Sequence, residues 1–229
     1  MTEDRDNFGY SDYTVYKQMH LQAILQTHLR VCEAVFRKND WPHKIYHYFD
    51  LHAGPGLYRH NGRIIKGSPM LFLDAWMAVG LNCRAVFFEI EDDRRTALQD
   101  AQRPRKKFGL IYADPSGSLP PFELLARFFE GKGYSTLDVL LYCSPTNLKR
   151  QLKASTCPVQ KRLGDYLELI PKRHWIVREP YGPHQWTFLI GTNWTDFPTF
   201  ERLGFYRWDS ARGKEIFDQL NFTREELAA

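Results

Sequence analysis

The feature of this chain that points most directly to ligand chemistry is an acidic residue followed by a glycine-rich loop. Asp50 ends an apolar and aromatic run, His52 follows it, and Gly54 and Gly56 come next. Glycine lets the backbone take positive φ values and approach a ligand without a Cβ clash. Open α/β sheets bind ligands at loops of this kind, beyond the carboxyl ends of their strands. The pattern predicts a nucleotide-like ligand, with His52 placed either to hydrogen-bond a carboxylate or to pack.

Two later strand-like runs also end in acidic residues. Glu89 is placed to accept both hydroxyls of a ribose, and Glu91 is its competitor because it lies on the same strand face. Asp114 is a candidate to accept hydrogen bonds from an amine that is being alkylated. Pro115 after it fixes the loop and leaves carbonyl oxygens as acceptors. Asp-Pro-Ser-Gly is also a good turn sequence, so an ordinary strand-to-helix turn is the competing interpretation.

Polar side chains elsewhere are candidates to complete the site. Lys17 and His20 lie one turn apart on a helical stretch and therefore share a face, which either reaches over the ligand or is the polar side of the helix. Tyr142 and Asn147 follow a later strand and are expected to line the same cleft. The histidines show no metal-ligand spacing, so no metal is expected.

The elements that must position these residues alternate between strand and helix. Apolar and turn patterns predict helices at 13–38, 68–79, 92–102, 121–130 and 147–170, the last with a break near 157, and strands at 45–52, 84–89, 108–114, 137–143, 174–178 and 186–190. Ser68 is expected to cap its helix, which Gly80 ends. Near-continuous apolar strands between helices predict a mostly parallel sheet covered on both faces. The last two strands are expected to form a hairpin that adds an antiparallel edge strand.

The sequence is interpreted as one domain over residues 1–229. Its parts are a flexible N-terminus (1–12), an added N-terminal helix (13–40), the sheet with its helices, and a C-terminal extension (195–229). No apolar run approaches the length of a membrane helix, and the acidic, polar N-terminus is not a signal peptide. The four cysteines are scattered without a Cys-x-x-Cys pair, which favours reduced thiols and a cytoplasmic location over a zinc site.

Charge favours a polyanionic partner without deciding the matter. The net charge is +4, and Arg103-Pro104-Arg105-Lys106-Lys107 forms a compact basic run. A looser basic group includes Lys149 and Arg150. Such clusters either hold phosphates of a nucleic acid or are solvated faces.

Four pieces of the chain together resemble the class I S-adenosylmethionine-dependent methyltransferases. They are Asp50-Leu-His-Ala-Gly-Pro-Gly, Gly67-Ser-Pro at a helix start, Phe88-Glu89, and Asp114-Pro115. Two branches are most similar. The three-Cys-motif partner family carries Asp-x-x-Ala-Gly-x-Gly, Gly-Ser-Pro and Asp-Pro-x-Gly. Bacterial ribosomal-RNA adenine-N6 methyltransferases carry Asp-Thr-His-Ala-Gly-Ala-Gly followed by Gly-Ser-Pro.

The resemblance covers roughly residues 13–192 and implies a Rossmann-like methyltransferase sheet with S-adenosyl-L-methionine as cofactor. It implies that the methionine part of the cofactor lies among Asp50, His52, Gly54 and Gly56, that Glu89 holds the ribose, and that cofactor contacts extend to Ser68, Lys17 and His20. Asp114 and Pro115 match the catalytic Asp-Pro-Pro-Tyr motif of the adenine-N6 enzymes. Substrate contacts are then expected from Tyr142, Asn147, Lys149 and Arg150.

The chain departs from the family pattern in two places. Ser116 and Gly117 replace the second proline and the aromatic residue that stacks on a flipped base, so Tyr112, Tyr142 or Tyr181 would have to supply the ring. Only 16 residues separate Glu91 from Phe108, which leaves the family's third strand compressed or absent.

The compressed segment allows a second alignment with the family. Residues 108–114 are then the third strand, and Ser144-Pro-Thr-Asn147 is a degenerate catalytic motif. The first alignment is favoured because it leaves a helix, 147–170, ahead of the terminal strand pair.

The expected function is therefore methyl transfer from S-adenosyl-L-methionine to an exocyclic amine of a nucleic-acid base, with adenine N6 as a candidate. The alternative is a non-catalytic or cofactor-sensing partner protein that keeps the fold, because Asp-Pro-Ser-Gly lacks the stacking residue. A nucleotide-binding oxidoreductase fits poorly, since Arg59 stands where Gly-x-Gly-x-x-Gly needs its third glycine.

Overall fold

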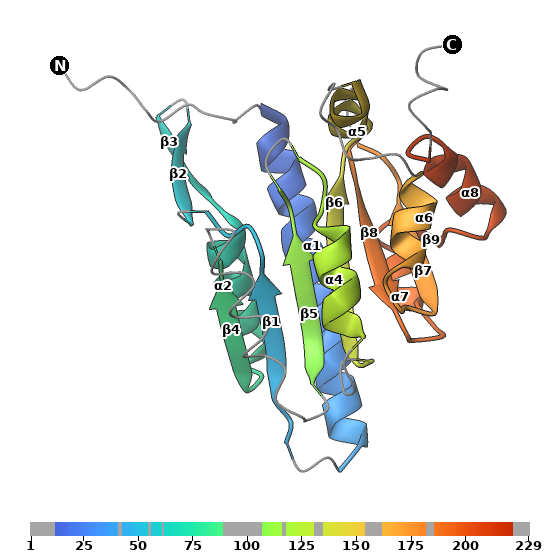
Figure 1. Ribbon diagram of the computed structural model, residues 1–229. Helices are drawn as coiled ribbons and strands as arrows, with labels where there is room; N and C mark the ends of the chain where they lie inside the picture. Colours follow the sequence, from blue (N-terminus) through green and yellow to red (C-terminus); the bar gives the residue numbers. More distant parts are fainter. Residues whose placement is uncertain are drawn as a thin grey trace.

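The protein, described here from a computed structural model, is built around a mixed and mostly parallel sheet covered by helices (Figure 1). The structure describes residues 12–40, 43–54, 56–60, 62–88, 107–115, 118–130, 135–153, 162–181 and 186–221. Within them the strand order of the main sheet is β4-β1-β5-β6-β8-β7-β9, and β2 pairs with β3 in a separate two-stranded sheet. The α/β class expected from the sequence is confirmed.

The strands form where apolar and aromatic runs were found in the sequence. Their bounds are β1 Tyr46–Asp50, β4 Cys83–Phe87, β5 Phe108–Ala113, β6 Leu137–Cys143, β7 His174–Arg178, β8 Thr187–Thr192 and β9 Phe205–Arg207. β1 pairs in parallel with both β4 and β5, and β5 pairs in parallel with β6. β8 runs antiparallel to both β6 and β7. Strands β5 and β6 are buried over most of their length, as a sheet covered on both faces requires.

The strand order reverses at β1, and this reversal locates the candidate site. The chain passes from β1 outward to β4 and then returns to the other side of β1, where β5 pairs with it directly. Open α/β sheets bind ligands at such a switch point, beyond the carboxyl ends of the strands. β5 is therefore a central neighbour of β1. The alternative alignment with the family, which made 108–114 the third strand, stays untested, while the strand itself lies beside β1 and opposite β4.

Helices cover both faces of the sheet, as predicted, because alternate residues of each strand point to opposite sides. One core joins Tyr46, Tyr48, Leu110 and Tyr112 to α1 (Asp12–Lys38) and α2 (Ser68–Val79). The other core lies against helices α4 (Phe122–Phe129), α5 (Pro145–Lys153), α6 (Leu163–Glu168) and α8 (Ala211–Asp218). The first turns of α1 lie at the carboxyl ends of the strands, so its N-terminal residues reach the switch point (Figure 1).

Several helix boundaries differ from the sequence-based expectations. The helix predicted at 147–170 is represented by α5, which begins at Pro145, and by α6, while 154–161 lie outside the described residues. A short helix α7 (Pro198–Glu201) and α8 occupy the C-terminal extension. Gly80 ends α2 with φ 75°, as predicted. The helix predicted at 92–102 and the N-terminus before residue 12 lie outside the described residues.

The sequence analysis placed the antiparallel strand of the terminal hairpin at the edge of the sheet, and this prediction is wrong. β8 lies inside the sheet between β6 and β7, and the unpredicted strand β9 forms the edge. All six residues of β8 are buried, and a strand with no exposed position needs neighbours on both sides. The sequence analysis also missed the hairpin of β2 (Leu57–His60) and β3 (Arg63–Lys66). Its signal was Asn61-Gly62, a dipeptide typical of two-residue hairpin turns.

In the part of the chain that the structure describes, no helix combines the length and apolar character needed to cross a lipid bilayer.

The backbone conformation of Gly109 leaves no room for a side chain beside β1. Gly109 pairs with His47 and has φ +149°, and a Cβ built on it would lie 1.7 Å from the His47 carbonyl oxygen. Both atoms belong to the backbone of paired strands, so relief requires the backbone of β5 or β1 to shift. We expect Gly109→Ala to lower the free energy of unfolding by more than about 3 kcal/mol, measured by urea denaturation.

Gly62→Ala is the matched control. Gly62 has φ +74°, but its Cβ would meet nothing within 4 Å. It should cost only about 1 kcal/mol, the price of the backbone conformation alone. Equal losses in the two variants would contradict the contact of a Gly109 Cβ with the β1 backbone.

Candidate functional site

The buried carboxylate of Asp50 organises the end of β1. Its Oδ1 accepts the backbone N–H of His52 at 3.1 Å, and the Tyr48 hydroxyl lies 3.5 Å from Oδ2. The Ser68 side chain also hydrogen-bonds Asp50. Burial raises the pKa of Asp50 to about 7, opposed by the bonds from Ser68 and His52 and reinforced by the charge of Asp114. One carboxyl group thus ties together the strand, the glycine loop and the first turn of α2.

The prediction that Ser68 caps α2 is wrong, and its actual position is more informative. Gly67 is the N-cap residue and makes no side-chain cap, while Ser68 is the first helical residue. Its side chain turns to Asp50 instead. Gly-Ser-Pro therefore links the helix start to the acidic end of β1.

The glycine loop has the backbone shape that the sequence predicted. Gly54 has φ 60° and Gly56 has φ 78°, both in the region that glycine favours. The N–H of Gly67 donates to the carbonyl of Gly56 at 2.6 Å, which closes the loop onto the start of α2. A Cβ on Gly54 would lie 2.3 Å from the Tyr58 hydroxyl, so the absent side chain makes room for this tyrosine of β2. At Gly54, glycine is thus required by packing as well as by φ.

Asp114 follows β5 and lies beside the end of β1. Its Oδ2 accepts hydrogen bonds from the Tyr112 hydroxyl and from Lys17 Nζ, each at 2.8 Å. Lys17 Nζ also lies 4.5 Å from the centre of the Tyr142 ring. Among the described residues no hydrogen bond reaches Oδ1. The Lys17 ammonium is therefore held between the carboxylate and an aromatic ring.

His20 lies one turn from Lys17 but has a different partner. Its Nδ1 accepts a hydrogen bond from Arg178 at 2.8 Å, and its ring lies 5.3 Å from Tyr181 and 5.8 Å from Trp186. Burial and then the charge of Arg178 lower the pKa of His20 to about 4, so the ring is neutral at neutral pH. The structure thus brings Lys17 to Asp114 and turns His20 toward the ends of β7 and β8.

An aromatic cluster extends from the acids to the hairpin of β7 and β8. Trp186 lies 6.1 Å from Tyr142 and 5.5 Å from Tyr181, and Tyr16 lies 5.1 Å from Tyr181. Two of the rings proposed as stacking partners, Tyr142 and Tyr181, belong to this cluster. The third, Tyr112, is fully buried and uses its hydroxyl to hold Asp114.

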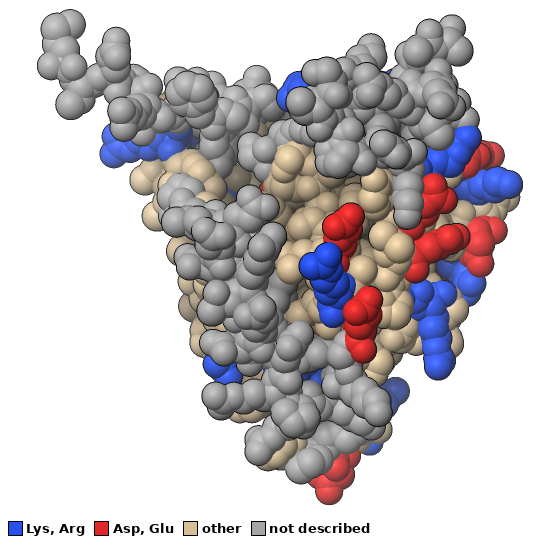
Figure 2. Space-filling view, viewed as in Figure 1, with Lys and Arg blue, Asp and Glu red and all other residues tan. Residues whose placement is uncertain are grey.

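The remaining candidates for substrate binding lie on α5, directly after β6. Asn147 is half-buried, while Lys149 and Arg150 are exposed. On the face seen in Figure 2, basic and acidic side chains are interspersed over α4 and the neighbouring helices, so its described part offers a polyanion no continuous basic surface. Of the basic run at 103–107, only Lys107 is described, and it is buried.

Some predicted site residues lie outside the described residues, namely Glu89, Glu91, Ser116 and Gly117. The structure adds Tyr48, Tyr58 and Arg178, which the sequence analysis did not place at the site, and it gives Tyr112, considered there as a stacking ring, the role of holding Asp114. Tyr48 and Tyr112 each stand two residues before an acid, on the same strand face. That spacing could have identified them. In the described part of the chain, no three His, Cys, Asp or Glu side chains gather as a metal site would require.

Comparison with known proteins adds no assignment. No protein-family model, no curated protein and no solved structure matches this chain. The chemistry of the site must therefore be argued from its own residues.

The raised pKa of Asp50 predicts a pH dependence of stability. A buried acid whose folded-state pKa exceeds its unfolded value stabilises fully below about pH 4, and this contribution is lost as pH rises toward 7. In Asp50→Asn that loss is absent. The stability of this variant relative to wild type should therefore rise by up to about 4 kcal/mol between pH 4 and 8, measured by urea denaturation.

Asp218→Asn, at an exposed carboxylate of α8, is the control. Its stability curve should run parallel to that of the wild type over the same range. If the Asp50→Asn curve is also parallel, the carboxyl group of Asp50 is not the titrating group.

Proposed function

We propose that this protein binds S-adenosyl-L-methionine at the switch point and transfers its methyl group to an amine, with an exocyclic amine of a nucleic-acid base as acceptor. The observation that carries the proposal is the pair of acids at the ends of β1 and β5. Asp50 bonds the backbone of the glycine loop, and Asp114 accepts an N–H group from the Lys17 ammonium. No other described region joins a loop for a nucleotide-like ligand to an acceptor of amine N–H groups.

The residues present fit a cationic cofactor. A positive charge bound near Asp50 and Asp114 favours the ionised form of Asp50, because it opposes the burial and the charge of Asp114 that raise the pKa of this carboxyl group. The positive-φ glycines shape the loop above, and Ser68 and His52 hold Asp50 in place. When bound, the cofactor supplies an activated methyl group on sulfur, so the protein needs mainly to align the acceptor.

Asp114 and Tyr142 are suited to position the acceptor. With Oδ2 fixed by the Tyr112 hydroxyl, Oδ1 can accept a hydrogen bond from the acceptor amine. This bond directs the nitrogen lone pair and favours loss of the amine proton as the new bond forms. The Tyr142 ring, which lies against Lys17, provides the stacking face that Ser116-Gly117 lacks.

The same geometry supports a second candidate, a partner protein that keeps the fold without methylating a substrate. Lys17 occupies both features that an acceptor amine would use, the Asp114 carboxylate and the Tyr142 ring. A catalytic protein must displace Lys17 when the acceptor binds. A scaffold would retain the ion pair of Lys17 with Asp114. In the catalytic candidate Asp114 binds the acceptor amine, whereas in the scaffold it only holds Lys17.

The test measures cofactor binding and methyl transfer separately. We expect S-adenosyl-L-methionine to bind in isothermal titration calorimetry and radiolabelled methyl groups to reach RNA or DNA. Asp114→Asn should leave the dissociation constant within about threefold and lower kcat by about 10²-fold or more, because it removes the acceptor of the amine proton. Absence of cofactor binding at millimolar concentration would overturn the proposal.

Asp209→Asn is the matched control, since this carboxylate forms an exposed ion pair with Arg207. It should change neither binding nor kcat. Cofactor binding with no transfer to nucleic acid, protein or small amines would favour the partner protein.

The exposed basic residues of α5 predict salt-dependent binding of nucleic acid. Lys149→Ala combined with Arg150→Ala should weaken binding of an RNA oligonucleotide and reduce the slope of log K against log salt by about 1 to 2. Fluorescence anisotropy at several salt concentrations measures both. Arg202→Ala with Lys214→Ala, also exposed but near α7 and on α8, should leave the slope unchanged.

A further inference from the structure

The hairpin of β2 and β3 stands apart from the main sheet, and both of its ends lie at the candidate site. It forms its own two-stranded sheet, which Figure 1 shows above α2, at the end of the main sheet where β1 meets the glycine loop. Gly56 precedes β2 and Gly67 follows β3, and the hydrogen bond between them closes the base of the hairpin. Each strand has four residues and is about 13 Å long. The hairpin is therefore a short arm beside Asp50.

The inner face of the hairpin packs on the glycine loop. Tyr58 pairs with Ile65 across the strands, and both side chains are half-buried. The Tyr58 ring lies so close to Gly54 and Gly67 that a Cβ on either glycine would clash with it. Because a shift of one residue would turn Tyr58 away from the glycines, this contact fixes the register of the hairpin and decides which side chains face outward.

The outer face of the hairpin combines exposed aliphatic side chains with positive charge. Leu57 pairs with Lys66 across the strands, and two residues further along β2, Arg59 pairs with Ile64. Cross-strand partners and alternate residues of a strand share a face, so these four side chains form the outer face. All four are exposed, Leu57 at 50% and Ile64 at 68%. Both aliphatic side chains are thus held in solvent beside basic groups.

The positive charge of the arm is compensated only in part. No aspartate or glutamate occurs in residues 51–73, and Lys66 pairs with Asp74 of α2. Arg59 and Arg63 are exposed, and within the described part of the chain neither forms an ion pair. Arg63 lies beside the turn, beyond the part of the inner face that packs on the glycines. The two guanidinium groups toward the free end of the arm are therefore available to an anion.

We infer that the outer face of this hairpin, with Arg63 at its tip, docks the strand of a nucleic acid next to the nucleotide that enters the site. A guanidinium group matches phosphate with two parallel hydrogen bonds, so Arg59 and Arg63 hold the backbone of that strand. Leu57 and Ile64 lie among these charges and provide apolar contact to sugars and bases. A two-stranded β-ribbon is also narrow enough for the major groove of B-DNA.

The position of the arm favours nucleic acid over other anionic partners. Figure 1 shows the ends of β1 and β5 between the hairpin and α5, which carries the exposed Lys149 and Arg150. A strand held at both places crosses the ends of β1 and β5, where Asp50 and Asp114 lie. The choice of nucleic acid rests on the proposed function, which puts the acceptor base at these two acids.

Fluorescence anisotropy of the full chain with labelled RNA and DNA oligonucleotides tests the charged part of the arm. Arg59→Gln combined with Arg63→Gln should weaken binding about tenfold and reduce the slope of log K against log salt by about 1 to 2, because two phosphate contacts are lost. Lys44→Gln combined with Arg84→Gln removes the same charge at the other end of the sheet, beside the amino-terminal ends of β1 and β4, and should change neither value. Equal weakening in the two double variants would overturn the inference.

Ile64→Ser tests the apolar part of the arm without changing its charge. It should weaken oligonucleotide binding about threefold to tenfold and leave the salt slope unchanged, because the slope counts phosphate contacts alone. Wild-type affinity in Ile64→Ser would reduce the arm to a diffuse cationic surface and overturn the inference. Tighter binding of phosphatidylserine vesicles or of polyglutamate than of either oligonucleotide would also overturn it, in favour of a membrane or an acidic protein.

Calorimetric titration with S-adenosyl-L-methionine separates this inference from the proposed function. The variants at Arg59, Arg63 and Ile64 should bind the cofactor within about threefold of the wild type, because the substituted side chains are exposed and Tyr58 is kept. Loss of cofactor binding in these variants alone would mean that the arm only supports the glycine loop, which overturns the inference. Absence of cofactor binding in the wild type would overturn the proposed function instead, and the oligonucleotide titrations of the variants would still decide the docking.

Discussion

Direct pairing of β1 with β5 is the constraint on which the rest of the structure depends. The two strands are in register from Tyr46 to Asp50, and the backbone conformation of Gly109 leaves no space for a side chain between them. This pairing brings the carboxyl end of each strand to the same edge of the sheet. Asp50 and Asp114, 64 positions apart in the sequence, become neighbours for this reason.

The proximity of two acids shapes the electrostatics around them. Neither carboxylate is exposed, and each is held by a tyrosine from its own strand, Tyr48 or Tyr112. Lys17 supplies a compensating positive charge from α1. The site is therefore arranged to favour positively charged or N–H-bearing groups, whether they come from the chain itself or from a ligand.

The sequence predicted much of this fold because local patterns were strong. The apolar runs identified six of the strands, and Asp50 with its glycines correctly marked a positive-φ loop at the end of one of them. The position of β8 could not be derived from such patterns. Whether a buried strand lies inside a sheet or at its edge depends on which partners it finds, and β9, only three residues long, gave no signal. The partners of Lys17 and His20 were equally hidden, because both contacts join residues about 100 or more positions apart.

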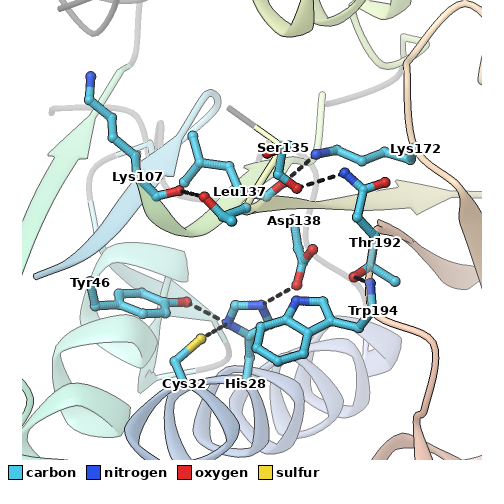
Figure 3. Close-up of polar contacts among 12 residues, drawn as sticks. His28, Cys32, Tyr46, Lys107, Ser135, Leu137, Asp138, Lys172, Thr192 and Trp194 are labelled. Carbon is cyan, nitrogen blue, oxygen red and sulfur yellow. Dashed lines mark hydrogen bonds and ion pairs between the residues drawn. The ribbon is translucent and has the colours of Figure 1, made fainter. Parts of the chain in front are cut away.

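The position of α1 has a mechanical consequence. Lys17, beside Asp114, and His28, beside Asp138 of β6 (Figure 3), are 11 residues apart on one helix. They therefore face nearly the same side and lie about 16 Å apart along its axis. One continuous helix is thus anchored to buried or half-buried carboxylates on two different strands, so a tilt of α1 at the switch point also strains its bond to β6.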